Sequence, residues 1–113
     1  MSFKNFVKPI VLESLNANTL GGGYVVINQL GLEQACIKVI ITNNSTATIT
    51  ISWDGVHAHD LLFPEQYREL SFLFYDATGL RTPEVKKGQI FYASAAAPGV
   101  GSINLTGYYV EAQ

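Results

Sequence analysis

Residues 35–64 read ACIKVIITNNSTATITISWDGVHAHDLLFP, and this stretch decides the fold class. From residue 37 to residue 41, β-branched side chains occupy every second position. After the polar residues Asn43-Asn44-Ser45, the same alternation resumes over residues 48–53. A period of two in β-branched residues is typical of half-buried antiparallel strands. The stretch therefore predicts two strands separated by a polar turn.

Asp54-Gly55 follows the second of these strands. This dipeptide favours the positive φ angles of a type I′ hairpin turn, so we expect a tight turn and a return strand that begins at Val56. The three strands would form a meander. Trp53 shares parity with the isoleucines at positions 49 and 51, and it is predicted to lie in the core. A register slip of one residue would expose all three side chains to water.

Further strands are expected on both sides of the meander. Pro9 lacks a backbone N–H and limits residues 10–12 to an edge strand at best. No segment shows a convincing apolar period of 3.6 residues, and turn signals recur about every ten residues. The other expected strands are residues 24–30, 67–75, 89–95 and 102–110. The chain is predicted to be all-β, an antiparallel β-sandwich (jelly-roll or Ig-like) of about seven to eight strands, in preference to a closed barrel.

The chain has 113 residues, which is the size of one domain. We assign residues 9–113 to a single β-sandwich domain and residues 1–8 to an N-terminal arm. The arm is apolar and has little to pack on within so small a domain, so we expect it to contact a neighbouring subunit. The predicted assembly-interface residues are Phe3, Phe6, Val7 and Ile10.

The composition of the chain indicates which classes of binding partner to expect. Only 14% of the residues are charged, against roughly 25% in an average soluble domain, which favours apolar contacts with other subunits. The net charge is −2, and the basic residues are scattered, so we expect neither nucleic acid nor a membrane surface as a partner. A single cysteine, Cys36, and an N-terminus without a signal-peptide pattern indicate synthesis in a reducing cytoplasm.

The best candidates for chemistry lie in residues 52–60. His57 and His59 would share one face of a strand, and Asp54 or Asp60 could add an oxygen ligand for a metal. Ser52, His57 and Asp60 are the residue types of a hydrolase triad, but the nucleophile-elbow sequence is missing. We interpret these residues as structural or interfacial, and we expect no enzyme, no metal and no cofactor.

Two other motifs are interpreted as structural. Gly21-Gly22-Gly23 is followed by neither Lys-Ser/Thr nor a helix, so we expect a flexible loop and no phosphate cradle. Cys36 lies in an apolar strand without a nearby base, which indicates a small buried hydrophobic residue and no nucleophile.

A carbohydrate-binding module is the alternative function, because β-sandwiches often bind sugars on exposed aromatic side chains. The parity of Trp53 places it in the core, and tyrosine is common in strands. An exposed stripe of tyrosines would favour sugar binding, whereas tyrosines buried at interfaces would favour assembly. The candidate residues are Tyr24, Tyr67, Tyr75, Tyr108 and Tyr109.

The segment ITNNSTATITISWDG followed by HAHDLLFP, at residues 40–64, resembles small β-sandwich virion proteins of tailed bacteriophages. Residues 87–92 (KGQIFY) and 101–109 (GSINLTGYY) continue the resemblance more weakly. Trp53 departs from the small residue that commonly follows serine in the family pattern. The resemblance implies a non-enzymatic structural component of the virion: a repeated building block of head decoration, neck or collar, or fibre attachment. It also implies that the partners are other copies of the chain and other virion proteins.

Overall fold

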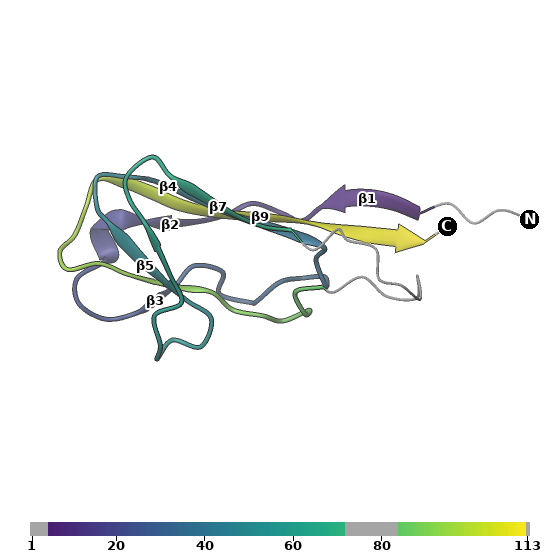
Figure 1. Cartoon of the computed structure of the whole chain (residues 1–113), viewed down its shortest axis with the longest axis horizontal. Coiled ribbons are helices and arrows are strands. Elements are labelled where there is room, and N and C mark those ends of the chain that lie inside the picture. Colours follow the sequence, from purple (N-terminus) through teal and green to yellow (C-terminus); the bar gives the residue numbers. More distant parts are fainter. Residues whose placement is uncertain (1–4, 72–83, 113) are drawn as a thin grey trace, which may run out of the picture.

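The computed structural model describes residues 5–71 and 84–112, which form two antiparallel sheets around one core (Figure 1). The strands are β1 (Asn5–Pro9), β2 (Glu13–Asn16), β3 (Val25–Val26), β4 (Lys38–Ser45), β5 (Ile49–Ser52), β6 (Asp60–Leu62), β7 (Tyr67–Ser71), β8 (Tyr92–Ser94) and β9 (Gly101–Ala112), and a 3₁₀ turn, η1 (Ala17–Thr19), follows β2. One sheet has the order β1-β9-β4-β7, with β2 also paired to β9, and the other has the order β3-β8-β5-β6. The predicted antiparallel β-sandwich is confirmed.

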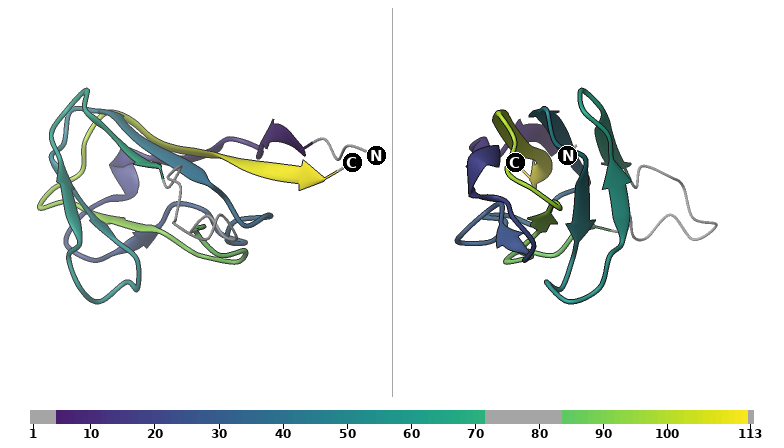
Figure 2. Two further views of the ribbon diagram at one scale, coloured as in Figure 1. Left: turned by 45° about the vertical axis from the view of Figure 1, so that its right-hand side comes forward. Right: turned by 90° about the vertical axis from the view of Figure 1, so that its left-hand side faces the viewer.

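Strand β9 is the longest strand, and it organises the first sheet. Its residues 101–108 pair with all of β4 on one side. On its other side it pairs first with β2 and then, at residues 108–112, with β1. Beyond the end of β4, the last residues of β9 pair with β1 alone. The two segments, residues 5–9 and 108–112, form a β1–β9 ribbon that projects from one end of the sandwich (Figures 1 and 2).

The predicted meander is wrong in its topology. Strand β4 lies in the first sheet, whereas β5 lies in the second, where it pairs with β6 and β8. The polar residues expected to form a turn, Asn43 to Ser45, are the last three residues of β4. The chain crosses between the sheets at residues 46–48. Asn43 and Ser45 can lie in a buried strand end because their side chains find hydrogen-bond partners there.

Asn43 is fully buried and links the two sheets. Its side-chain Nδ2 donates to the carbonyl of Ala47 at 2.8 Å and to that of Leu62 at 3.2 Å. Its Oδ1 accepts the hydroxyl of Ser45 at 2.6 Å. The Asn43 backbone also accepts the N–H of Glu65 at 2.8 Å, in the turn between β6 and β7. One residue thus fixes both the crossover after β4 and the return from β6.

The core lies between the sheets and receives side chains from both. Ile49 and Ile51 are buried, as their parity predicts. The largest fully buried hydrophobic side chains are Leu20, Leu32, Val39, Ile41, Ile49, Leu62, Phe91, Ile103 and Leu105. A single cluster that includes residues of β4, β5, β8 and β9 is the pattern of two sheets packed face to face.

An ion pair lies across one open side of the sandwich, where β6 of one sheet is followed by β7 of the other. Asp60 is the register partner of Ile51, and Arg68 is that of Ile41, so both charged side chains lie on the core side of their sheets. Arg68 Nη2 lies 3.0 Å from Asp60 Oδ1. The connecting turn, residues 63–66, has positive φ (66°) at Glu65.

Several strand boundaries differ from the prediction. The strand expected over residues 24–30 is regular only at β3. Beyond β3, the buried side chain of Asn28 replaces backbone pairing between strands. Its Nδ2 donates to Gln89 O, and its Oδ1 accepts the N–H of Phe91. Residues 10–12 form the break between β1 and β2. The strand expected over residues 67–75 is β7 as far as Ser71, and its remaining residues lie outside the described part of the chain.

Replacing Asn43 by alanine removes the donor to two buried carbonyls and the acceptor of the Ser45 hydroxyl. A buried polar group without a partner costs about 1–3 kcal/mol. Asn43→Ala is therefore expected to lower the free energy of unfolding by about 2–4 kcal/mol in chemical denaturation. Asn44→Ala is the matched control, because that side chain is exposed and its loss should change stability by about 0.5 kcal/mol or less. Equal effects of the two variants would contradict the role of Asn43.

Candidate functional site

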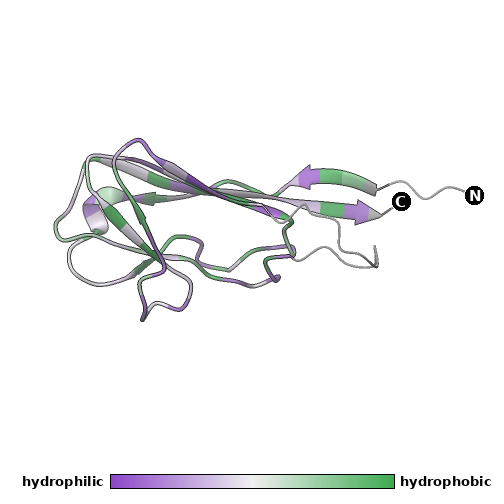
Figure 3. Ribbon diagram, in the orientation of Figure 1, coloured by the Kyte–Doolittle hydropathy of each residue, from purple (hydrophilic) through white to green (hydrophobic). Residues whose placement is uncertain are grey.

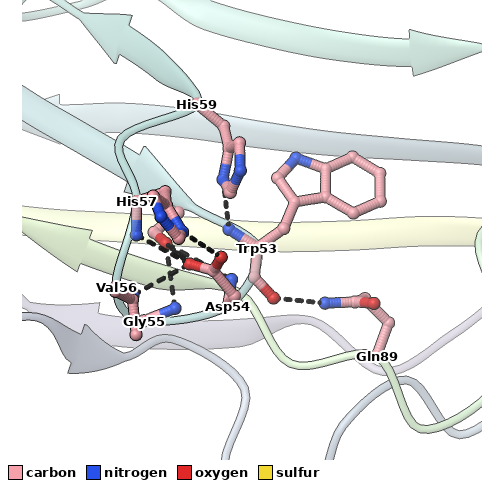
Figure 4. A network of polar contacts seen from close by, with 8 residues as sticks. Trp53, Asp54, Gly55, Val56, His57, His59 and Gln89 are labelled. Atoms are coloured by element: carbon pink, nitrogen blue, oxygen red, sulfur yellow. Dashed lines mark hydrogen bonds and ion pairs between the residues drawn. The ribbon is translucent and has the colours of Figure 1, made fainter.

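The loop between β5 and β6, residues 53–59, contains both histidines of the chain (Figure 4). The Asp54 carboxylate organises it. Oδ1 accepts the backbone N–H groups of Val56 and His57, both at 2.8 Å, and Oδ2 lies 2.7 Å from Nδ1 of the His57 ring. Asp54 therefore closes the loop on itself, as aspartate side chains do in Asx turns.

Ser52 supports the same loop from the end of β5. Its hydroxyl donates to Asp54 Oδ1 at 3.0 Å and accepts the backbone N–H of Gly55 at 2.9 Å. Ser52 is fully buried. The hydroxyl is thus fixed by its own loop.

The structure does not bring Ser52, His57 and Asp60 together as a triad. The Ser52 hydroxyl bonds to Asp54, and Asp60 bonds to Arg68. A nucleophilic serine needs a hydrogen bond to a general base, and the base needs an orienting partner. In this loop Asp54 lies between Ser52 and His57, so the serine bonds to the aspartate and not to a histidine base.

The electrostatics of the loop centre on Asp54. Hydrogen bonds hold the pKa of its carboxyl group well below the usual range: chiefly the backbone N–H of His57, then the His57 ring and the N–H of Val56. Hydrogen bonds that favour the charged form have this effect. The carboxylate is consequently an acceptor at neutral pH and a poor candidate for a general acid.

The two histidines point to different partners. Nδ1 of His59 accepts the backbone N–H of Trp53 at 3.0 Å, whereas Nδ1 of His57 faces Asp54. Their ring centroids are 6.3 Å apart. Within residues 5–71 and 84–112, no group of three histidine, cysteine, aspartate or glutamate side chains is placed to hold a metal ion.

Gly55 has a φ of +76°, as expected of a glycine in a turn. The predicted type I′ turn is nevertheless wrong, because it also needs positive φ at Asp54, and Glu65 is the only non-glycine residue with positive φ in the described chain. The return strand begins at Asp60, not at Val56. A Cβ at Gly55 would lie 3.2 Å from the ring of Tyr92, so this glycine also allows the loop to pack against β8.

Trp53 lies one residue beyond the end of β5 and is half-buried. Its ring packs edge-on against buried Phe91, with centroids 4.8 Å apart. Its backbone carbonyl accepts the Nε2 of Gln89 at 2.8 Å (Figure 4). Trp53 therefore covers the margin of the core and does not lie within it as its parity predicted.

Cys36 is buried and forms a backbone bridge with Val85. Burial raises the pKa of its thiol, and nearby Glu84 and Glu33 act in the same direction. A raised pKa reduces the thiolate fraction, so the predicted role as a buried small hydrophobic residue is confirmed. Residues 21–23 form an exposed connection, tied to the sandwich by the N–H of Gly22, which donates to Ala95 O at 2.8 Å.

The described tyrosines do not form one exposed stripe. Tyr67 is 65% exposed on the outer edge strand β7. Tyr108 is half-buried on the outer face of β9, whereas Tyr109 packs against the core. Tyr24 precedes β3 in the other sheet, and Tyr75 lies outside the described residues. This scatter offers no aromatic platform for a sugar ring in the described part of the chain.

The predicted interface residues divide between surface and core. Phe6 is 43% exposed and Val7 is 62% exposed, and both lie in the projecting β1–β9 ribbon. Ile10 differs from the expectation: it is 7% exposed and belongs to the core cluster, so it anchors the base of the ribbon. Phe3 lies outside the described residues. The expected free arm is also strand from residue 5 onward, because β1 pairs with β9.

Sequence reasoning missed one exposed apolar residue of the ribbon. Val110 is 41% exposed and directly opposite Val7 in the pairing of β1 with β9. Its sequence signal is an apolar side chain at the parity of the polar residues Asn104 and Thr106, on the face turned away from the core. Its partner could not be known without the register.

Two hollows on the sandwich offer no assembled chemistry. One, of about 290 Å³, is lined by residues 46–48 and 95–98, which carry no charged side chain. Another, of about 90 Å³, has Glu13 and Glu33 at its wall, and Glu33 already accepts the N–H of Val11 at 2.8 Å. Small-molecule sites are usually about 300–1,000 Å³.

In the described residues, no helix has the length and apolar character needed to cross a membrane.

Compared with protein-family models, with curated proteins and with solved structures, the chain gives no match. The resemblance of residues 40–64 to bacteriophage virion proteins therefore stays a prediction. Support for a function comes from the geometry of the loop and of the ribbon.

Trp53→Ala should lower the free energy of unfolding by about 2–3 kcal/mol, because the edge-on contact with Phe91 and the cover of the core margin are lost. This is less than the roughly 3–5 kcal/mol of a fully buried tryptophan. Trp53→Phe, the matched control, keeps an aromatic ring and should lose less than half as much. A Trp53→Ala variant that melts like the wild type would contradict the packing role.

The lowered pKa of Asp54 predicts a pH dependence with a definite sign. The carboxylate is favoured in the folded chain, so its contribution is complete above the unfolded value of about 3.9 and disappears as pH falls through the lower folded value. The backbone amide resonances of Val56 and His57 should shift on acidification with a midpoint below about pH 3.9. In Asp54→Asn this transition should be absent. A midpoint at or above the ordinary aspartate value would refute the assignment.

Proposed function

We propose that this chain is a non-enzymatic structural component of a bacteriophage virion, a repeated building block that acts through contacts with other copies of itself and with other virion proteins. Its place would be in head decoration, in the neck or collar, or at the attachment of a fibre. The resemblance of residues 40–64 supports the setting. The protein would be made in the host cytoplasm and function in the particle.

The observation that carries the assembly role is the projecting β1–β9 ribbon (Figure 2). A two-stranded ribbon is at best marginally stable in water and needs further strands or a packing surface. This ribbon exposes Phe6, Val7 and Val110. An extended, apolar projection on a compact sandwich suits attachment to a neighbouring subunit.

The contacts of the histidine loop support a non-enzymatic role. The polar groups of Ser52, Asp54 and His57 bond to one another and to the backbone of the same loop. Such a closed network stabilises a loop shape and leaves its carboxylate ionised. The described tyrosines form no exposed stripe, which speaks against the alternative of a carbohydrate-binding module.

Deletion of residues 2–8 tests the proposal in the phage that encodes the chain. Within this segment Phe6 and Val7 are exposed, so the sandwich core is untouched and the melting temperature should stay within about 5 °C of the wild type. Incorporation into purified particles, measured by mass spectrometry, should be lost. Val100→Ser, the control, alters a 76% exposed side chain next to the opposite end of β9 and should incorporate normally. Normal incorporation of the folded deletion variant would overturn the role of the ribbon.

Electron microscopy of wild-type particles with a labelled chain would assign the position. Label at the head surface, neck or fibre base would support the virion role. A chain that is expressed during infection but is missing from purified particles would refute it. Specific binding of the isolated protein to a glycan array, abolished by Tyr67→Ala, would instead favour the sugar-binding alternative.

A further inference from the structure

The outer edge of β1 offers backbone groups for pairing. Among the described residues, β1 pairs with β9 alone. In antiparallel pairs, residues alternate between those whose peptide groups face the partner strand and those whose groups face away. Ile10 donates its N–H to Gly107 O at 2.9 Å, so it faces β9. Counting back along β1, Lys8 also faces β9, whereas the peptide groups of Val7 and Pro9 point outward.

We propose that two copies of the chain associate by pairing the outer edges of β1 antiparallel, about a twofold axis at Val7. At the axis, the outward N–H of Val7 in each copy donates to the C=O of Val7 in the other copy. At each end, the N–H of Asn5 meets the carbonyl of Pro9. The N–H that proline lacks lies at the margin of this pairing, where a proline is tolerated.

The side chains of the ribbon are self-complementary in this register. Val7 and Val110 are opposite each other on one face, so the twofold axis produces a row of four valines across four strands, from Val110 of one copy to Val110 of the other. Figure 3 shows hydrophobic residues in both strands of the ribbon. Four strands with a shared apolar row form a sheet of the kind that an isolated ribbon needs for stability.

The charged side chains of the ribbon allow the same pairing. Lys8 Nζ lies 3.0 Å from Glu111 Oε2 within one copy, so each ribbon carries a matched pair of charges. In the proposed register Lys8 is opposite Phe6 of the second copy, and no two like charges are directly opposite each other. The twofold pairing thus needs no charge neutralisation by a third partner. The apolar row and the balanced charges of the ribbon therefore fit a second copy of the chain as the occupant.

This inference rests on the proposed assembly role and deepens it by naming the first partner and the contact. The two can fail separately. A wild type that is incorporated into particles but does not pair through β1 would refute the inference alone. Pairing by a chain that is missing from particles would refute the virion role alone.

A charge exchange at the twofold position tests the pairing directly. Val7→Lys and Val7→Glu each place like charges against each other across the axis, whereas an equimolar mixture places lysine against glutamate. The wild type should show a monomer–dimer equilibrium in analytical ultracentrifugation. Each single variant should raise the Kd on the order of tenfold or more, and the mixture should recover heterodimers. Recovery by mixing requires that residue 7 of one copy faces residue 7 of the other.

Val56→Lys and Val56→Glu are the matched controls, because Val56 is 72% exposed in the loop between β5 and β6, away from the ribbon. They should dimerise like the wild type, alone and mixed. Circular dichroism should show the same β-fold for all four variants. A wild type that stays monomeric at millimolar concentration would overturn the proposal. It would also be overturned by Val7 variants that dimerise unaided, or by a mixture that dimerises no better than its components.

Discussion

The buried side-chain amide of Asn43 joins the two sheets at one edge of the sandwich. It lies at the end of β4 and satisfies the carbonyls of Ala47 and Leu62, which belong to the crossover and to the second sheet. Buried carbonyls without donors are costly, so the amide lowers the cost of bringing the two sheets together at this edge. Hydrophobic burial supplies most of the driving force. The asparagine decides which strands are brought together.

The sequence predicts the class of fold because alternation reports which side chains are buried. Ile49 and Ile51 were placed correctly on that basis. Alternation does not report the neighbour of a strand, and consecutive strands are equally alternating in a hairpin and in a crossover between two sheets. Asn43 to Ser45 therefore read as a turn. The burial of Asn43 and Ser45 depends on partners at residues 47 and 62, which local patterning cannot show.

The candidate loop was predictable in its residues but not in its contacts. Asp54-Gly55 does turn the chain, with positive φ at the glycine. The turn is wider than a two-residue hairpin, since Asp54 accepts the backbone N–H groups of Val56 and His57 and draws both residues into the loop. For the same reason β5 ends at Ser52, and Trp53 turns toward the margin of the core. Side-chain capping overrode the local preference for a tight hairpin.

Strand β9 forms part of the sandwich and also part of the projecting β1–β9 ribbon. Strand β9 has 12 residues, and its residues 102–105 lie between β4 and β2. Residues 109–112 extend past β4 and pair with β1, and Ile10 is anchored in the core at the junction. Because the buried part of β9 fixes its register, the exposed part is presented in one defined orientation. Folding of the sandwich thus positions the apolar edge in advance, which would reduce the entropy lost in the proposed association.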